Sequence, residues 1–308
     1  MRVVFMGTPE FAVNVLQGLI DNYDVVGVVS QPDKRVGRHQ VLTSTPVKKL
    51  ALEYDIPVLQ PIRVREEYDE IIKLKPDIII TCAYGQIIPK ELLDYPRLGC
   101  INVHASLLPK LRGGAPINRA LMENYKCTGI TIMYMDTKMD NGDIIEQKKL
   151  DITDEDNLDS LYNKLSLLGK NLLLETLPSI INGTNKRIKQ DEKEVTYAYN
   201  IKREEEHINF NMDSRSVFNL IRGLSPIPGA NAILDDKEMK IYSSMILTEK
   251  YSGECGEIVS INKQGIIVKT MDGSIAITSL KPFGKKRMDA LSYVNGVGKD
   301  KLIGKVFR

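Results

Sequence analysis

Ile101-Asn102-Val103-His104-Ala105-Ser106-Leu107-Leu108-Pro109 is the stretch from which the organisation of the chain can be worked out. It sets an amide and an imidazole two residues apart at the end of an apolar run, and side chains at that spacing on a strand point to the same face. Pro109 has no backbone N–H, so the strand must end before it. Open α/β sheets carry out their chemistry at the carboxyl ends of strands. Asn102 and His104 are therefore candidate catalytic residues, although a strand-end histidine satisfied by local hydrogen bonds is an equal alternative from this stretch alone.

A second polar cluster follows the apolar run at residues 129–134. It is the acidic turn Asp136-Thr137-Lys138-Met139-Asp140-Asn141-Gly142-Asp143. An aspartate from a separate strand-end loop can orient the imidazole of His104 and favour its charged form, as acid–base catalysis requires. We therefore expect Asn102, His104 and Asp140 to come together.

Composition limits the class of protein. With 308 residues, 43% of them hydrophobic, the chain is long enough for two ordinary globular domains. The four cysteines are scattered without a C-x-x-C pair, and the three histidines lack metal-ligand spacing. No apolar run approaches the length of a membrane span or a signal-peptide core. We expect a cytoplasmic monomer without a disulfide, a metal or a membrane association.

The first 185 residues alternate short apolar runs with helical patterns, which predicts an α/β domain with a mainly parallel sheet covered on both faces. The expected strands are Arg2–Met6, Val25–Ser30, Asp77–Thr81, Cys100–His104 and Gly129–Tyr134. The expected helices are Pro9–Ile20, Pro46–Tyr54, Glu66–Leu74, Ala115–Met122 and a long closing helix over Asn157–Ile181.

The pattern changes after about residue 190. Residues 191–206 are charged and predict a linker, residues 218–223 a helix, and residues 230–280 several short strands. Lys263-Gln264-Gly265 and Met271-Asp272-Gly273 are typical of hairpin turns. Short antiparallel strands in about 80 residues indicate a small barrel, of which an OB-like barrel is one form. From residue 206 onward Lys and Arg outnumber Asp and Glu by 15 to 11, although the net charge of the whole chain is only +2.

Two clusters of cations could contact nucleic acid, although each could also be ordinary solvated surface. One is the long polar loop at residues 30–40, which carries Lys34, Arg35 and Arg38. The other is Lys281-Pro282-Phe283-Gly284-Lys285-Lys286-Arg287, which we expect beyond the last barrel strand. Between strand and helix, Gly7-Thr8-Pro9 lacks the glycine spacing of a nucleotide-phosphate loop. Thr8 suits a helix N-cap there.

The motifs quoted above, Asn102-Val103-His104, Ser106-Leu107-Leu108-Pro109 and Asp140-Asn141-Gly142-Asp143, resemble the folate-dependent formyltransferase family. Further motifs resemble its methionyl-tRNA branch, and together they extend over essentially the whole chain. These are Phe5-Met6-Gly7-Thr8-Pro9-Glu10-Phe11-Ala12, Gln31-Pro32-Asp33, Ala83-Tyr84-Gly85, Arg97-Leu98-Gly99-Cys100 and Val195-Thr196-Tyr197-Ala198. The chain departs from the family at His39-Gln40-Val41, where some members carry a lysine pair, and at Ile227, where an aromatic residue is common.

The resemblance implies transfer of a formyl group from 10-formyltetrahydrofolate to the α-amine of methionyl initiator tRNA, with no metal. It implies that Asn102, His104 and Asp140 are catalytic. It implies folate binding by Ser106, Leu107, Leu108, Pro109, Ala83, Tyr84 and Gly85. It implies tRNA binding by Lys34, Arg35, Arg38, Lys285, Lys286 and Arg287.

The implied organisation is a Rossmann-like catalytic domain over residues 1–189, a linker over 190–206 and a C-terminal OB-like, tRNA-contacting barrel over 207–308. Three alternatives remain open. They are a formyltransferase acting on a small-molecule amine, a hydrolase that releases formate, and a non-catalytic RNA-binding protein. A C-terminal barrel and a basic loop argue against a small acceptor, which needs neither.

Overall fold

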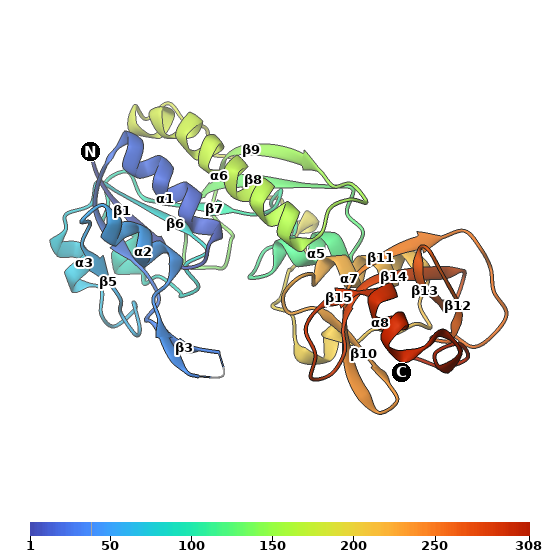
Figure 1. Ribbon diagram of the computed structural model, residues 1–308. Helices are drawn as coiled ribbons and strands as arrows, with labels where there is room; N and C mark the ends of the chain where they lie inside the picture. Colours follow the sequence, from blue (N-terminus) through green and yellow to red (C-terminus); the bar gives the residue numbers. More distant parts are fainter. Residues whose placement is uncertain (38) are drawn as a thin grey trace. The chain divides into compact units, whose positions relative to one another are not determined.

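The structure is a computed structural model that describes residues 1–37 and 39–308. It divides into two compact units (Figure 1). The first consists of Met1–Pro116, Cys127–Asp151 and Tyr162–Tyr199, and the second of Ile117–Lys126, Ile152–Leu161 and Asn200–Arg308. Within the described residues, no helix is both long enough and apolar enough to cross a bilayer.

A seven-stranded sheet forms the centre of the first unit, in the order β5-β2-β1-β6-β7-β8-β9. The first five strands in that order are parallel, and the last two pairings, β7 with β8 and β8 with β9, are antiparallel. The strands are β1 (Arg2–Gly7), β2 (Asp24–Val29), β5 (Val58–Leu59), β6 (Ile78–Cys82), β7 (Cys100–His104), β8 (Cys127–Tyr134) and β9 (Ile144–Asp151). Every residue of β6 is buried, as its mostly apolar sequence predicts for a strand covered on both faces.

The first unit also contains several helices. They are α1 (Phe11–Asn22), α2 (Pro46–Glu53), α3 (Asp69–Lys73), α4 (Lys90–Leu93) and α6 (Leu158–Ile181), of which the part from Tyr162 onward belongs to this unit. Helix α6 is fastened to the start of α1 by two side chains. The Phe11 N–H donates to the Tyr162 hydroxyl at 2.8 Å, and the Ser166 hydroxyl donates to the Phe11 carbonyl at 2.7 Å. The first of these bonds satisfies a backbone N–H at the start of α1 that the helix itself leaves open.

The second unit contains an antiparallel sheet in the order β10-β11-β14-β13-β12, with β15 paired to β14. Its strands are β10 (Ala230–Leu234), β11 (Lys237–Leu247), β12 (Ile258–Asn262), β13 (Gly265–Lys269), β14 (Ser274–Lys281) and β15 (Met288–Asp289). Its helices include α5 (Pro116–Met122, counted here from Ile117), α7 (Ser214–Gly223) and α8 (Ala290–Val297).

The last residues of the chain connect the two ends of this sheet. Beside β12, the Ile258 N–H donates to the Lys305 carbonyl at 2.8 Å. Beside β10, Ile233 and Arg308 exchange both backbone hydrogen bonds, at 2.5 and 2.9 Å. The edge strands are thereby paired instead of exposed, as closure into a barrel requires.

The expected fold class is confirmed: a mainly parallel sheet comes first and an antiparallel β structure second. The five strands expected in the first unit and the two hairpins expected in the second are present. The expected boundaries at residues 189 and 207 stay a prediction. The division into compact units assigns two earlier segments of the chain, 117–126 and 152–161, to the second unit. Polar side chains join these segments to the rest of that unit. Arg119 pairs with Glu205 at 2.7 Å, and Arg222 donates to the Thr153 carbonyl at 2.6 Å.

Three local expectations were wrong. The segment at residues 30–40, expected as a loop, contains the strand β3 (Lys34–Val36). This strand pairs with β4 (Val41–Thr43) in a hairpin whose mostly exposed residues leave no alternating pattern. The cluster at residues 281–287 begins with the last residue of β14 and ends directly before β15, so it is not beyond the last strand. Thr8 is not the cap of α1, because the helix begins at Phe11. Its hydroxyl instead accepts from the Gln31 N–H and donates to the Tyr84 carbonyl, joining three strand-end loops.

We predict that Gly129→Ala destabilises the first unit by about 1–3 kcal/mol, the usual cost of overpacking. A Cβ at this position in β8 would lie 2.2 Å from the Lys148 carbonyl oxygen and 2.6 Å from the Leu107 side chain. Urea denaturation measures the change. Gly296→Ala, at an exposed position of α8 where an added Cβ would meet no atom within 4 Å, serves as the control and should leave stability unchanged or slightly higher. Equal stabilities for the two variants would contradict the packing of β8 against β9.

Candidate active site

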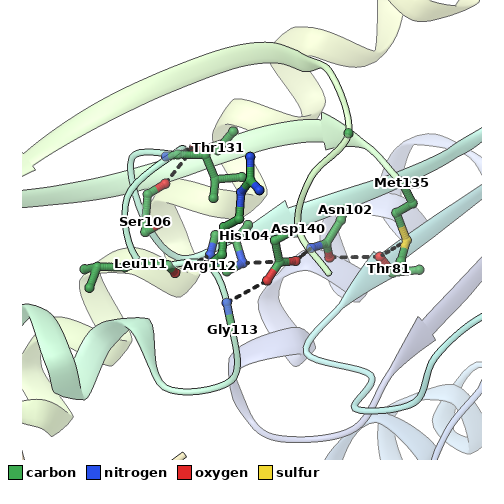
Figure 2. A network of polar contacts seen from close by, with 12 residues as sticks. Thr81, Asn102, His104, Ser106, Leu111, Arg112, Gly113, Thr131, Met135 and Asp140 are labelled. Atoms are coloured by element: carbon green, nitrogen blue, oxygen red, sulfur yellow. Dashed lines mark hydrogen bonds and ion pairs between the residues drawn. The ribbon is translucent and has the colours of Figure 1, made fainter. Parts of the chain in front are cut away.

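Two neighbouring parallel strands present the first catalytic candidates. Thr81 of β6 and Asn102 of β7 are paired in register, and His104 ends β7 two residues later. The Thr81 hydroxyl lies 2.8 Å from Asn102 Oδ1, and the His104 side chain is only 6% exposed. Figure 2 shows the side chains of Asn102 and His104 directed to the same region beside these strand ends.

Asp140 reaches the same region from the loop between β8 and β9. Its Oδ2 accepts a hydrogen bond of 2.8 Å from the Gly113 N–H. Its Oδ1 lies 3.5 Å from Asn102 Nδ2 and 3.7 Å from His104 Nδ1 (Figure 2). The expected convergence of the three side chains is thus present. The separation between His104 and Asp140 is longer than a hydrogen bond, which leaves the imidazole nitrogen able to bond elsewhere.

The orientations of His104 and Asn102 are fixed by neighbouring groups that can only accept hydrogen bonds. His104 Nε2 lies 3.0 Å from the Leu111 carbonyl oxygen, so this nitrogen carries a proton and donates. Nδ1, which faces Asp140, is therefore the nitrogen that remains available to a substrate. By the same reasoning the carboxylate of Asp140 directs the NH₂ group of Asn102 toward itself.

A buried arginine that sequence reasoning missed holds the Asp140 loop. Arg112 is 3% exposed and donates to Gln190 Oε1 at 3.0 and 2.9 Å and to Glu192 at 3.0 Å. Gln190 Nε2 in turn donates to the carbonyls of Asp140 and Gly142, at 2.8 and 2.9 Å. The expected linker therefore takes part in the site through its first residues. No local pattern signals this, because Arg112 and Gln190 lie 78 residues apart.

The four folate candidates at residues 106–109 are mostly enclosed. Ser106 is fully buried and donates to the Lys110 carbonyl at 2.7 Å. The Leu108 N–H donates to the Thr131 hydroxyl at 3.1 Å, and its carbonyl accepts from Gln147 at 2.8 Å. Leu107 and Pro109 are half-buried. This segment can contribute shape and apolar surface, while the polar groups named here are already bonded within the protein.

The Ala83–Gly85 turn follows β6 and is differently exposed along its length. Ala83 and Gly85 are exposed with φ of +49° and +84°, and Ile87 beside them is 80% exposed. The Tyr84 side chain is instead buried in the core, and burial raises the pKa of its phenol. Its carbonyl accepts from Thr8 and from Gln31. A ligand at this turn would meet Ala83, Gly85 and Ile87, and the Tyr84 ring would support the turn from beneath.

The cationic candidates lie in different units. Lys34 and Arg35 are exposed on β3, and Arg38 lies outside the described residues. Lys285, Lys286 and Arg287 are exposed between β14 and β15, where Arg287 donates to the Ser279 hydroxyl at 3.0 Å and lies over the Tyr242 ring.

The β3–β4 hairpin is fastened at its base by Asp33. This carboxylate accepts from Lys48 at 2.7 Å and from Gln60 at 2.8 Å. These bonds, that from Lys48 above all, hold the pKa of the Asp33 carboxyl below its ordinary value.

The candidate site offers no cysteine nucleophile, because burial raises the pKa of the Cys100 thiol to about 12 and that of Cys82 further. Among residues 1–37 and 39–308, no group of three or more His, Cys, Asp and Glu side chains is arranged to hold a metal ion. A cavity of about 350 Å³ lies in the second unit, lined by residues that include His207, Phe210 and Phe307, and takes no part in this site.

Two family models match most of the chain. The family model for formyl transferase matches residues 1–177, and that for the formyl transferase C-terminal domain matches residues 200–298. Methionyl-tRNA formyltransferase of Staphylococcus aureus strain MW2 is 49% identical over 99% of this chain and 98% of its own, and that of strain JH1 is 48% identical over the same shares.

Solved structures share the fold at lower identity. WlaRD, a sugar 3N-formyl transferase crystallised with dTDP and 5-N-formyl-THF, aligns with a TM-score of 0.70 at 24% identity, over 93% of this chain and 99% of its own. An N-formyltransferase from Helicobacter canadensis aligns with a TM-score of 0.68 at 22% identity, over 89% and 98%.

We predict that the Asp33 carboxyl titrates below the ordinary value of about 3.9, and that Lys48→Met raises its pKa because the main hydrogen-bond donor is absent from the variant. A carboxyl group whose pKa is lower in the folded than in the unfolded state stabilises the folded protein at pH values above the unfolded-state pKa. This stabilisation disappears as the pH falls through the folded-state value. NMR titration of the carboxyl carbon measures the shift. Lys49→Met, on the next residue of α2, is the control, and the same Asp33 pKa in both variants would contradict the Lys48 contact.

Proposed function

This chain belongs to the formyl transferase family, and from that premise we propose which of its residues carry out the reaction. The protein transfers a formyl group from a folate-derived donor to the α-amine of methionyl initiator tRNA, for translation initiation. The observation that carries this function is 49% identity over 99% of the chain, which favours it over the small-molecule acceptor. Our proposal for the donor is 10-formyltetrahydrofolate, with no metal.

The proposed donor site is the turn at Ala83–Gly85 together with residues 106–109. A flat heterocycle needs an apolar surface beside backbone polar groups. The exposed Ala83, Gly85 and Ile87 at the carboxyl end of β6 fit this need, next to the strand that bears Asn102. Leu107 and Pro109 would add apolar contact.

We assign the acyl transfer to Asn102, His104 and Asp140, with direct attack of the substrate amine on the formyl carbon. The Asn102 NH₂ group and His104 Nδ1 in its protonated form would donate to the oxygen that becomes negative in the tetrahedral intermediate. Such a donor contributes roughly 3–4 kcal/mol where it has been measured. Two observations support this assignment. Asn102 Nδ2 is directed toward Asp140, and His104 Nε2 is bonded to the Leu111 carbonyl, which leaves Nδ1 as the ring nitrogen available to the substrate.

Asp140, whose Oδ1 lies 3.7 Å from His104 Nδ1, would receive the proton that the attacking amine loses, because the protonated Nδ1 cannot accept it. The bond from the formyl carbon to the donor nitrogen then breaks, and the same proton goes to that nitrogen. The N–H of Gly113 and the Gln190 side chain hold Asp140 in position for both transfers. The buried, unreactive thiols nearby support a route without a formylated enzyme.

One assay tests the function. Release of tetrahydrofolate from 10-formyltetrahydrofolate is followed with methionyl initiator tRNA, charged elongator tRNA, a free amine, or water alone. We expect rapid release only with methionyl initiator tRNA. Equal rates with the small amine would support the small-molecule alternative, and equal rates with water would support a hydrolase.

We predict that Asn102→Ala, His104→Ala and Asp140→Asn each lower the turnover number by about two orders of magnitude or more, because each removes a group that acts in the transition state. Steady-state kinetics and circular dichroism measure activity and folding together. Asp136→Asn, in the same turn as Asp140 but bonded to Asn141, is the control and should keep normal turnover. Two substitutions together should cost less than the product of the single effects. Normal turnover in Asp140→Asn would remove this residue from the mechanism.

We also propose that Lys34, Arg35, Arg38, Lys285, Lys286 and Arg287 bind tRNA phosphates. Lys285→Gln combined with Lys286→Gln should raise the Michaelis constant for methionyl-tRNA. It should also reduce the log–log salt slope by roughly 0.7–0.9 for each phosphate that is no longer neutralised. The paired control, Lys299→Gln with Lys301→Gln, removes two exposed charges from the same unit. Identical salt slopes in the two double variants would contradict a role for the Lys285 cluster, and the Michaelis constant for the folate should not change in either.

A further inference from the structure

Two tyrosines are stacked on the surface of the first unit. The ring centroids of Tyr197 and Tyr199 are 5.6 Å apart and their planes differ by 12°. Although each ring covers part of the other, the two residues are 47% and 63% exposed. Ala198 between them is fully buried. The alternation directs both rings away from the core, on one face of the segment 195–199, which we call the strap.

The strap is bonded to the segment that orients the catalytic side chains. Thr196 accepts from the N–H groups of Leu111 and Arg112, both at 2.9 Å, through its hydroxyl and its carbonyl. The Ala198 N–H donates to the Arg112 carbonyl at 2.7 Å. This same segment holds His104 through the Leu111 carbonyl and Asp140 through the Gly113 N–H. A short run of backbone therefore links the stacked rings to both catalytic groups.

Close approach of the strap depends on a glycine. A Cβ on Gly113 would lie 2.7 Å from the Ala198 carbonyl oxygen, and the residue has φ of +125°. The strap is thus seated against the catalytic segment without a side chain between them. Tyr197 and Tyr199 are held in a fixed position beside the site, which is what a binding surface for a rigid ligand group needs.

The acceptor substrate supplies such a group. The reacting α-amine is part of a methionyl ester on the ribose of the 3′-terminal adenosine, so the terminal adenine lies a few bonds from the atoms that Asn102 and His104 contact. A nucleobase stacks well on exposed tyrosine rings. We propose, on the basis of the proposed function, that Tyr197 and Tyr199 form a stacking platform for the 3′-terminal adenine of methionyl-tRNA. They act as positioning residues that bring the amine to the catalytic side chains.

The position of the strap favours the adenine over the aromatic ring of the folate. In the sheet order, the exposed part of the proposed donor site, the turn at residues 83–85, leaves β6. The strap instead pairs with Arg112, three residues beyond the largely enclosed donor segment 106–109 that leaves β7. Asn102 and His104 lie on β7, between the donor turn and the β8 side of the sheet. Donor and acceptor would then approach the catalytic side chains from different segments, as a direct transfer between them requires.

The platform is tested with Tyr199→Ala, Tyr199→Phe and the double variant Tyr197→Ala/Tyr199→Ala. Stacking on one aromatic side chain corresponds to roughly a 5- to 150-fold effect. We expect kcat/KM for methionyl-tRNA to fall by that factor in Tyr199→Ala, mainly through KM, and further in the double variant. Tyr199→Phe keeps the ring and should remain within about twofold of the wild type. Tyr95→Ala removes a 41%-exposed ring that precedes the amino end of β7, whereas His104 lies at the carboxyl end of this strand, and should have no effect.

A spectroscopic probe separates stacking from a structural role. Methionyl-tRNA with 2-aminopurine in place of the terminal adenine should lose fluorescence on binding to the wild type and to Tyr199→Phe, but much less on binding to Tyr199→Ala. If Tyr199→Ala does not fold, Tyr199→Leu replaces it, because leucine keeps the apolar volume without a flat ring, and the same weakening of the quenching is expected.

Three results would overturn the platform. One is an unchanged kcat/KM for methionyl-tRNA in the double variant, and a second is quenching that persists without either ring. The third is a raised KM for 10-formyltetrahydrofolate with unchanged tRNA kinetics, which would assign the rings to the folate. Failure of the proposed function is a separate outcome, since the wild type itself would then not formylate methionyl-tRNA.

Discussion

The hydrogen bond between His104 Nε2 and the Leu111 carbonyl is the interaction on which the arrangement of the site depends. This bond occupies one imidazole nitrogen, and the other, Nδ1, faces Asp140. Two residues later the Gly113 N–H holds the Asp140 carboxylate. Leu111 and Gly113 both have positive φ, at +61° and +125°, and a left-handed leucine costs energy that surrounding contacts must offset. The strap bonded to Leu111, Arg112 and Ala115 supplies those contacts.

The buried guanidinium of Arg112 and its partners stabilise the same arrangement. Arg112 would be costly to bury alone, and its guanidinium is satisfied by Gln190 and by the carboxylate of Glu192. Gln190 also donates to two backbone carbonyls of the Asp140 loop and thereby holds this loop in position. The loop is thereby fixed on two sides, by Gly113 at the carboxylate and by Gln190 at the backbone. Fixed dipoles and charges of this kind stabilise a developing oxyanion without the reorganisation that water would need.

The sequence predicts those parts of the fold and site that follow from local pattern. Alternation and apolar runs indicate the main strands, and spacing on one strand sets Asn102 and His104 on one face. Contacts between distant segments are different. Arg112 and Gln190 are polar residues whose partners lie far along the chain, and the segments 117–126 and 152–161 carry no signal that they pack with the second unit. The β3–β4 hairpin, exposed along its length, and the two-residue β5 are too short or too solvated to leave a pattern.

The protonation of the His104 ring tests this arrangement of the site most directly. Nitrogen-15 NMR can follow this ring because the chain contains only three histidines. We expect the neutral ring to carry its proton on Nε2, so that Nε2 resonates as a protonated imidazole nitrogen and Nδ1 as an unprotonated one. A neutral ring with its proton on Nδ1 would contradict this arrangement, because an unprotonated Nε2 could not donate to the Leu111 carbonyl.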